Sequence, residues 1–202
     1  MRHLKVYCLF IMITLLLTGC VGEEKSLPNT KITIESYNMS DKERLLISKT
    51  DVGRIEFFML NGSLKKEEDL QFSVEVFENG KFKEELLQTW DAPETKYEDS
   101  LISFGISDTS DEDHSLKMIN GIPSGLSTTF YPNNMTSSSF SKLIDEKMIL
   151  EKNKPIYLVA WLGTTKNGLR SVGGENGDQP SGIEESELAF LYKVLWTDKE
   201  KK

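Results

Sequence analysis

Residues 188–196 read Leu-Ala-Phe-Leu-Tyr-Lys-Val-Leu-Trp, and Lys193 is the one charged side chain in this stretch. A second stretch, Ile156–Leu162, is also almost continuously apolar. A strand with one face in water alternates apolar and polar residues, whereas these two stretches leave no polar face. We therefore predict two strands covered on both faces. Sequential strands usually lie side by side, and an antiparallel pair needs no helix in its connection. We place the two as antiparallel neighbours at the middle of a sheet.

The connection between the two stretches, Thr164–Glu187, is about two dozen residues long and rich in glycine and acidic residues. Loops of this length are uncommon inside a compact domain and are usually either functional or disordered. The sequence leaves both interpretations open.

Elsewhere the dominant signal is alternation with a period of two residues, which is typical of half-buried strands. Ile32–Ile34, Ile55–Met59 and Ile102–Ile106 show it, and Asn-Gly or Pro-Asn turn signals separate such runs. The pattern predicts a mainly β fold, an antiparallel β-sandwich of immunoglobulin-like kind with one short helix. We assign residues 31–198 to this single domain.

The clearest hairpin is Leu70–Trp90, in which two alternating apolar sets flank Asn79-Gly80. A two-residue turn would pair Val76 with Lys83 and place the two apolar sets on opposite faces. A three-residue loop, Glu78-Asn79-Gly80, pairs Val76 with Phe82 and places them on the same face. Because a one-residue shift moves every side chain to the other face, burial favours the three-residue loop, although Asn-Gly alone favours the shorter turn.

The predicted helix is Ser139–Met148. Its apolar residues Phe140, Leu143, Ile144 and Met148 fall on one helical face, and Asp145 and Glu146 point away from it. Ser138 or Ser139 is a suitable N-terminal cap.

The N-terminus has the three parts of a secretory signal peptide. Arg2 and Lys5 are positive, Val6–Leu17 is broken only by Thr14, and small residues lead to Cys20. This apolar run is too short to span a bilayer, which takes roughly 20 residues.

Leu17-Thr18-Gly19-Cys20 resembles the lipobox of bacterial lipoproteins. The resemblance covers about the first twenty residues and implies that Cys20 receives a diacylglyceryl group, with fatty acids such as palmitate, and becomes the new N-terminus. Residues 1–19 are then the signal peptide and residues 20–30 a lipid-anchored tether. The implied location is the extracytoplasmic face of the cell membrane.

The composition is acidic, with 24 basic and 32 acidic residues and a net charge of −8. Loss of the signal peptide removes Arg2 and Lys5 and brings the charge to about −10. Binding to nucleic acid depends on basic residues that neutralise phosphate, so we expect no nucleic-acid partner. Cys8 leaves with the signal peptide, and the exported domain has no cysteine for a disulfide. The excess of Lys over Arg suggests an AT-rich, Gram-positive source.

The sequence contains no complete catalytic motif of the kinds considered below. His114 is the single histidine after the signal peptide, and a Ser-His-Asp triad would need it as its base. Ser63–Lys66 and Ser139–Lys142 match Ser-x-x-Lys, but the companion motifs of penicillin-recognising enzymes are missing. We predict no catalytic residue. The alternative is an extracytoplasmic hydrolase using acidic residues such as those of Ser107–His114.

Two acidic segments are candidates for calcium. Asp108 and Asp111–Asp113 depart from the EF-hand spacing, and Gly173–Asp178 resembles a single calcium-binding repeat of a kind that works by stacking. We predict no metal site and no cofactor, with a calcium-stabilised adhesion module as a further alternative.

The three tryptophans could line a sugar or peptide groove, although their strand phase favours the core: Trp90, Trp161 and Trp196. The interpretation that we prefer is an envelope lipoprotein whose β domain is a non-catalytic binding or interaction module for an envelope protein or glycan. Carboxylates that converge in one concave pocket would favour the enzyme, and acids on convex loops would favour the binding module.

Overall fold

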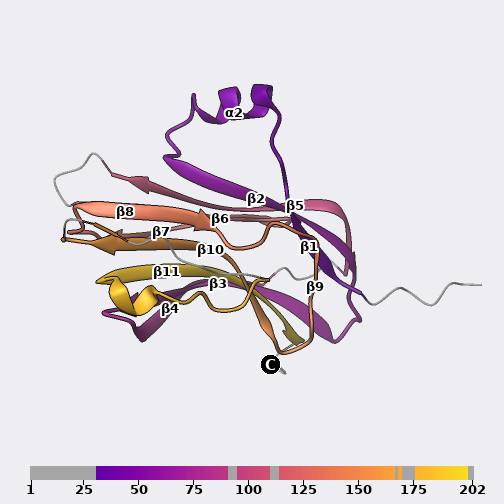
Figure 1. Cartoon of the computed structure of the whole chain (residues 1–202). Helices are drawn as coiled ribbons and strands as arrows, with labels where there is room; N and C mark the ends of the chain where they lie inside the picture. The colour runs from indigo at the N-terminus through magenta and orange to yellow at the C-terminus, as the bar shows by residue number, and fades with distance from the viewer. Residues whose placement is uncertain (1–30, 91–94, 110–113, 167, 170–175, 200–202) are drawn as a thin grey trace, which may run out of the picture.

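The computed structural model describes residues 31–90, 95–109, 114–166, 168–169 and 176–199. Two antiparallel sheets face each other and form a β-sandwich (Figure 1). The six-stranded sheet has the order β7-β6-β5-β2-β1-β9, and the five-stranded sheet has the order β4-β3-β11-β10-β8. The predicted mainly β sandwich is confirmed. It shares the face-to-face sheets of immunoglobulin domains, but its eleven strands exceed their seven or nine.

The strands of the six-stranded sheet are β1 (Thr33–Ser36), β2 (Arg54–Ser63), β5 (Lys96–Asp108), β6 (Ser115–Ile122), β7 (Gly125–Pro132) and β9 (Met148–Ile149). The strands of the five-stranded sheet are β3 (Glu68–Glu78), β4 (Lys81–Trp90), β8 (Ser137–Lys142), β10 (Pro155–Thr164) and β11 (Leu188–Asp198).

The core lies between the sheets and is built mainly by alternate residues of β2, β3, β5, β6, β10 and β11. Phe104 of β5 stacks on Tyr192 of β11 with ring centroids 4.9 Å apart. The buried Tyr192 hydroxyl donates to Asn120 Oδ1 at 2.8 Å, and Asn120 Nδ2 donates to Thr89 Oγ1 at 2.8 Å. This buried polar chain is hydrogen-bonded throughout, as buried polar groups must be to avoid a desolvation penalty.

The two apolar stretches are adjacent antiparallel strands, with β11 at the centre of the five-stranded sheet, as predicted. Their inward side chains enter the main core, and their outward side chains form a second buried cluster with Phe77 and Leu143. Part of the Thr164–Glu187 connection covers this outer face: Ile183, on the short 3-10 helix η1 (Ile183–Glu185), belongs to the cluster, and Leu169 packs against it. Both faces of the sheet centre are therefore covered.

The predicted register of the β3–β4 hairpin is wrong. The turn is the two-residue Asn79-Gly80, because Glu78 pairs with Lys81 and both turn residues have positive φ, 50° and 73°. A bulge at Lys83 then shifts the register, so Val76 faces Glu84 instead of Phe82. The intrinsic preference of Asn-Gly determined the turn, and the extra residue in the edge strand restored an inward-facing phase for Leu86.

The helix predicted for Ser139–Met148 is also wrong. Residues 137–142 form β8, which pairs with β10 and places Phe140 opposite Trp161, and Met148 begins β9. The backbone groups of this segment are paired with the edge of β10. The segment is rich in serine, which is a weak helix former because its side chain competes for backbone hydrogen bonds. Leu143 and Ile144 are buried without a helix.

The one α-helix of the described residues is α2 (Asp41–Ile47), which stands off the six-stranded sheet beyond β1 and β2 (Figure 1). Ser40 accepts a hydrogen bond from Glu43 N, and the Glu43 carboxylate accepts one from Ser40 N. This capping box satisfies the first turn of a helix that buries no residue.

Candidate functional site

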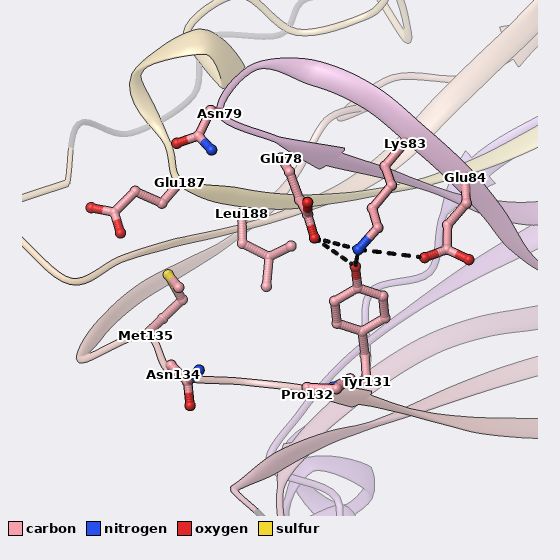
Figure 2. A pocket seen from close by; sticks show the side chains of 10 residues that line it. All are labelled: Glu78, Asn79, Lys83, Glu84, Tyr131, Pro132, Asn134, Met135, Glu187 and Leu188. Carbon is pink, nitrogen blue, oxygen red and sulfur yellow. Dashed lines mark hydrogen bonds and ion pairs between the residues drawn. The ribbon is translucent and has the colours of Figure 1, made fainter.

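A pocket of about 470 Å³ opens at one end of the sandwich, where the β3–β4 turn, the β7–β8 loop and the start of β11 meet (Figure 2). We call it the end pocket. Its lining residues are Glu78, Asn79, Lys83, Glu84, Tyr131, Pro132, Asn134, Met135, Glu187 and Leu188.

The hairpin geometry places the charged side chains of the end pocket. Glu78 precedes the Asn79-Gly80 turn, and the bulge puts Lys83 and Glu84 on the pocket side of β4. In a regular hairpin these successive residues would point to opposite faces. The bulge therefore brings two charged groups to one end of the sandwich, a common use of bulges near functional sites.

Lys83, Glu78 and Tyr131 form a closed triangle (Figure 2). Lys83 Nζ lies 2.5 Å from Glu78 Oε1 and 3.0 Å from the Tyr131 hydroxyl, which donates to Glu78 Oε1 at 3.1 Å. The hydrogen bond from Lys83 lowers the pKa of Glu78, and the hydrogen bond to Glu78 raises the pKa of Lys83. Burial raises the pKa of Tyr131. At neutral pH the pair is ionised and Tyr131 keeps its proton.

The other two carboxylates have different partners. Glu84 Oε1 lies 4.0 Å from Lys83 Nζ, and the Glu84 side chain is 43% exposed, so it keeps acceptor capacity for a ligand. Glu187 accepts hydrogen bonds from the hydroxyls of Thr164 and Thr165, both at 3.0 Å. The Thr165 hydroxyl is the main cause of a lowered Glu187 pKa. Three carboxylates against one ammonium leave the end pocket net negative.

The remaining lining is uncharged. Leu188, Met135 and Pro132 supply apolar contacts, and the amides of Asn79 and Asn134 supply donors and acceptors. An apolar wall beside ionised carboxylates suits a ligand with an alkyl stem and a cationic head, such as a lysine or arginine side chain.

Of the residues that we singled out from the sequence, those that the structure describes lie away from the end pocket. Cys20 and Asp111–Asp113 lie outside the described residues. His114 is exposed at the start of β6, and its carbonyl oxygen accepts a hydrogen bond from Asn133. Lys142 of the second Ser-x-x-Lys segment donates to Ser36 Oγ and pairs with Asp145. His114 and Lys142 do not line the end pocket.

The structure also places the calcium candidates and the tryptophans. Asp178 pairs with Lys154 at 3.7 Å, and within the described ranges no group of three or more His, Cys, Asp or Glu side chains is arranged to hold a metal ion. Trp161 is buried, Trp196 packs against the core, and Trp90 is partly exposed on β4. They do not form a common groove.

Sequence reasoning missed the end pocket. The Asn79-Gly80 turn was visible, and with it the neighbouring Glu78. The bulge at Lys83 has no local signal. Tyr131 in β7 and Glu187, just before β11, are far away in the sequence. The pocket exists only after the two sheets pack.

A second polar cluster lies on the outer face of the five-stranded sheet. Lys193 is 8% exposed and bonds to Glu75 and, at 3.0 Å, to Glu85. Tyr157 donates to Glu75 at 3.0 Å, and Ser73 donates to Glu85 at 2.5 Å. Although burial opposes it, the hydrogen bonds from Ser73 and Lys193 lower the pKa of Glu85. The members satisfy one another, and we assign the cluster a structural role.

Comparisons with known proteins returned no relative. No protein-family model matches the chain, and neither a curated protein nor a solved structure matches it. Across the described ranges, no helix has both the length and the apolar character needed to cross a membrane.

Proposed function

We propose that the protein is a lipoprotein of the bacterial cell envelope, anchored through Cys20 on the extracytoplasmic face, whose β-sandwich is a non-catalytic binding module. The signal-peptide layout and the Leu17–Cys20 box support the anchor. Two acyl chains suffice for stable attachment.

The anchor is tested by Cys20→Ala. We expect this variant to incorporate no fatty acid in metabolic labelling and to leave the membrane fraction. Cys8→Ala is the matched control because it removes the other cysteine and keeps the box. Equal labelling of Cys20→Ala and the parent would refute the anchor.

We infer that the end pocket is the binding site and that it receives a cationic group on an alkyl stem. The observation that supports this is its composition: three carboxylates, one lysine already paired with Glu78, and an apolar wall. A bound cation would pair with Glu84, whose side chain is 43% exposed, while Glu187 points away from Glu84 and adds negative charge at the far side of the pocket (Figure 2).

Carboxylates that converge in one concave pocket are the arrangement that we expected of a hydrolase. Three carboxylates line the end pocket, but Glu187 points away from Glu78 and Glu84 (Figure 2). A carboxyl group that acts as a general acid has a raised pKa. The pKa values of Glu78 and Glu187 are lowered instead, by Lys83 and by Thr165. Two of the three carboxylates are thus held as acceptors, which supports ion pairing over proton transfer.

The test is isothermal titration of the full chain in detergent with acetyl-arginine amide at low ionic strength. Glu84→Gln should weaken binding about tenfold, because a charge-assisted hydrogen bond is lost, and Glu187→Gln should weaken it less, because only a more distant negative charge is removed. Glu146→Gln, an exposed residue outside the pocket, is the control and should bind as the parent does. Equal affinity in all four proteins would refute the site.

A further inference from the structure

We infer that the β7 edge of the six-stranded sheet accepts an extended peptide as an added strand, and that a basic side chain of this peptide enters the end pocket. The inference rests on the proposed function of the end pocket and identifies its ligand as a basic peptide segment. Strand addition to a sheet edge is a recurrent mode of peptide recognition, in which backbone hydrogen bonds supply affinity and side-chain pockets supply specificity.

The first observation is that β7 ends the order of its sheet, with β6 as its one hydrogen-bonded neighbour among the described strands, while β4 of the other sheet also lies close to it. Asn133 N donates to His114 O, which marks that pair as hydrogen-bonded. Hydrogen-bonded and non-hydrogen-bonded pairs alternate along an antiparallel ladder. The pairs that contain Tyr131, Thr129 and Ser127 are therefore hydrogen-bonded to β6 as well. The backbone groups of Leu126, Thr128 and Phe130 therefore point away from β6.

The second observation is that β7 lacks the devices that protect the edge strands β4 and β9. Natural edge strands are blunted by charges, bulges or short length. The edge strand β4 carries Lys81, Lys83, Glu84 and Glu85 with two register shifts, and β9 has two residues. The interior of β7 reads Leu-Ser-Thr-Thr-Phe-Tyr, without charge, and its pairing with β6 is continuous from Gly125 to Pro132.

The third observation concerns the side chains beside the free backbone groups. Leu126 and Phe130 are 71% and 60% exposed, and they pair with Gly121 and Lys117 on the outer face. An added strand would place apolar side chains next to both. Cross-strand pairs of this kind contribute roughly 0.2–1 kcal/mol each, and the ladder hydrogen bonds add to them.

The end pocket adjoins this edge. Tyr131 and Pro132, the last residues of β7, line it beside Glu84 of β4 (Figure 2). A chain following β7 advances about 3.3 Å per residue, so one that covers Leu126 to Phe130 has its next residues at the pocket. The carboxylates of the end pocket select a basic side chain at this position of the peptide.

The charge of the protein decides between a peptide and a second copy of the chain as occupant. An edge-to-edge dimer through β7 would bring together two chains that each carry a net charge of about −10 after loss of Arg2 and Lys5, and their acidic pockets would lie near the shared edge. A basic segment has the complementary charge, and we assign the edge to it.

The test uses acetyl-Arg-Thr-Val-Thr-Val-Thr-amide and two versions that carry N-methyl groups on alternate amides in opposite phase, titrated into the full chain in detergent. In strand addition one phase of methyl groups faces β7 and the other faces solvent. We expect one methylated peptide to bind as the parent peptide does and the other to lose about tenfold or more. Equal affinity of all three peptides would refute the added strand.

Variants separate this inference from the proposed function. Thr128→Pro removes an outward N–H, whereas Thr128→Ala keeps it; both are compared by thermal unfolding to verify folding. We expect Thr128→Pro to weaken the peptide about tenfold and to leave acetyl-arginine amide unchanged, while Glu84→Gln weakens both ligands.

The remaining outcomes each contradict a specific statement. Full peptide affinity in a folded Thr128→Pro protein would refute the edge and leave the end pocket intact. Full affinity of both ligands for Glu84→Gln would refute the pocket itself. A dimer of the parent in sedimentation that Thr128→Pro dissociates would show that a second copy, and not a basic peptide, occupies the edge.

Discussion

The two outer faces of the sandwich differ in what lies over them. On the five-stranded sheet, Leu191 and Ala160 are fully buried because part of the Thr164–Glu187 connection, including Ile183, packs on them. On the six-stranded sheet, Leu101 and Phe130 are 45% and 60% exposed. The same sandwich thus has a sheet whose centre is enclosed on both sides and a sheet with one open side. The difference teaches that a long connection in this fold completes a core.

The largest expected effect tests the enclosed sheet at its centre. Phe190→Ala should lower the free energy of unfolding by about 3–5 kcal/mol. Phe190 is fully buried on β11 and its ring lies 5.1 Å from those of Trp161 and Tyr131. Denaturant unfolding measures this loss of stability. The matched control is Phe130→Ala on the open face, which should cost less than about 1 kcal/mol. Similar losses in the two variants would contradict the comparison.

The polar cluster around Lys193, on the enclosed outer face of the five-stranded sheet, should contribute to stability as a buried ion pair does. Lys193→Ala leaves Glu75 and Glu85 without their ammonium partner, and removal of one member of a buried ion pair costs about 3 kcal/mol. Lys117→Ala, on the open face, should change stability by less than about 0.5 kcal/mol. A Lys193→Ala protein as stable as the parent would show that water reaches this cluster freely.

The cover itself is tested by Ile183→Ala. Ile183 is 6% exposed, and its truncation should cost about 2 kcal/mol in denaturant unfolding. Leu101→Ala provides the comparison on the open sheet and should be close to neutral. If the two variants have equal stability, the connection does not contribute to the core.

The smallest effect is a dependence on pH. The pKa of Glu85 is lower in the folded protein than its ordinary value of 4.5. A carboxyl with a lowered folded pKa contributes stability that is present above its unfolded pKa and is lost as pH falls through its folded pKa. Stability should therefore fall below about pH 4.5, and less steeply in Glu85→Gln. Parallel curves for the two proteins between about pH 5 and 3 would contradict this assignment.

The two central strands show where reasoning from the sequence succeeds. The stretches at 156–162 and 188–196 were predicted as central, doubly covered strands, and they are β10 and β11. Their apolar continuity is a local property with one physical solution, because no orientation of such a strand leaves a polar face for water. The sequence did not identify what covers the outer face, since Ile183 is one apolar residue in a polar segment.

Other elements needed information that no local window holds. The segment at 137–142 has helical periodicity but forms β8, because β10 offers its edge. Local chemistry determined the Asn79-Gly80 turn, while packing determined the bulge that follows it. α2 could have been found, since Ser40 and Glu43 form a capping box.

The sequence by itself determined the β class, the identity of the two central strands and the lipobox expectation, because each follows from the chemistry of contiguous residues. The tertiary structure alone decided the hairpin register, the end pocket and the unprotected β7 edge. The end pocket is lined by Lys83, Tyr131 and Glu187, which are separated along the chain and come to one end of the sandwich only when the two sheets pack. Contacts of this kind depend on the packing of both sheets at once, and no short segment specifies them.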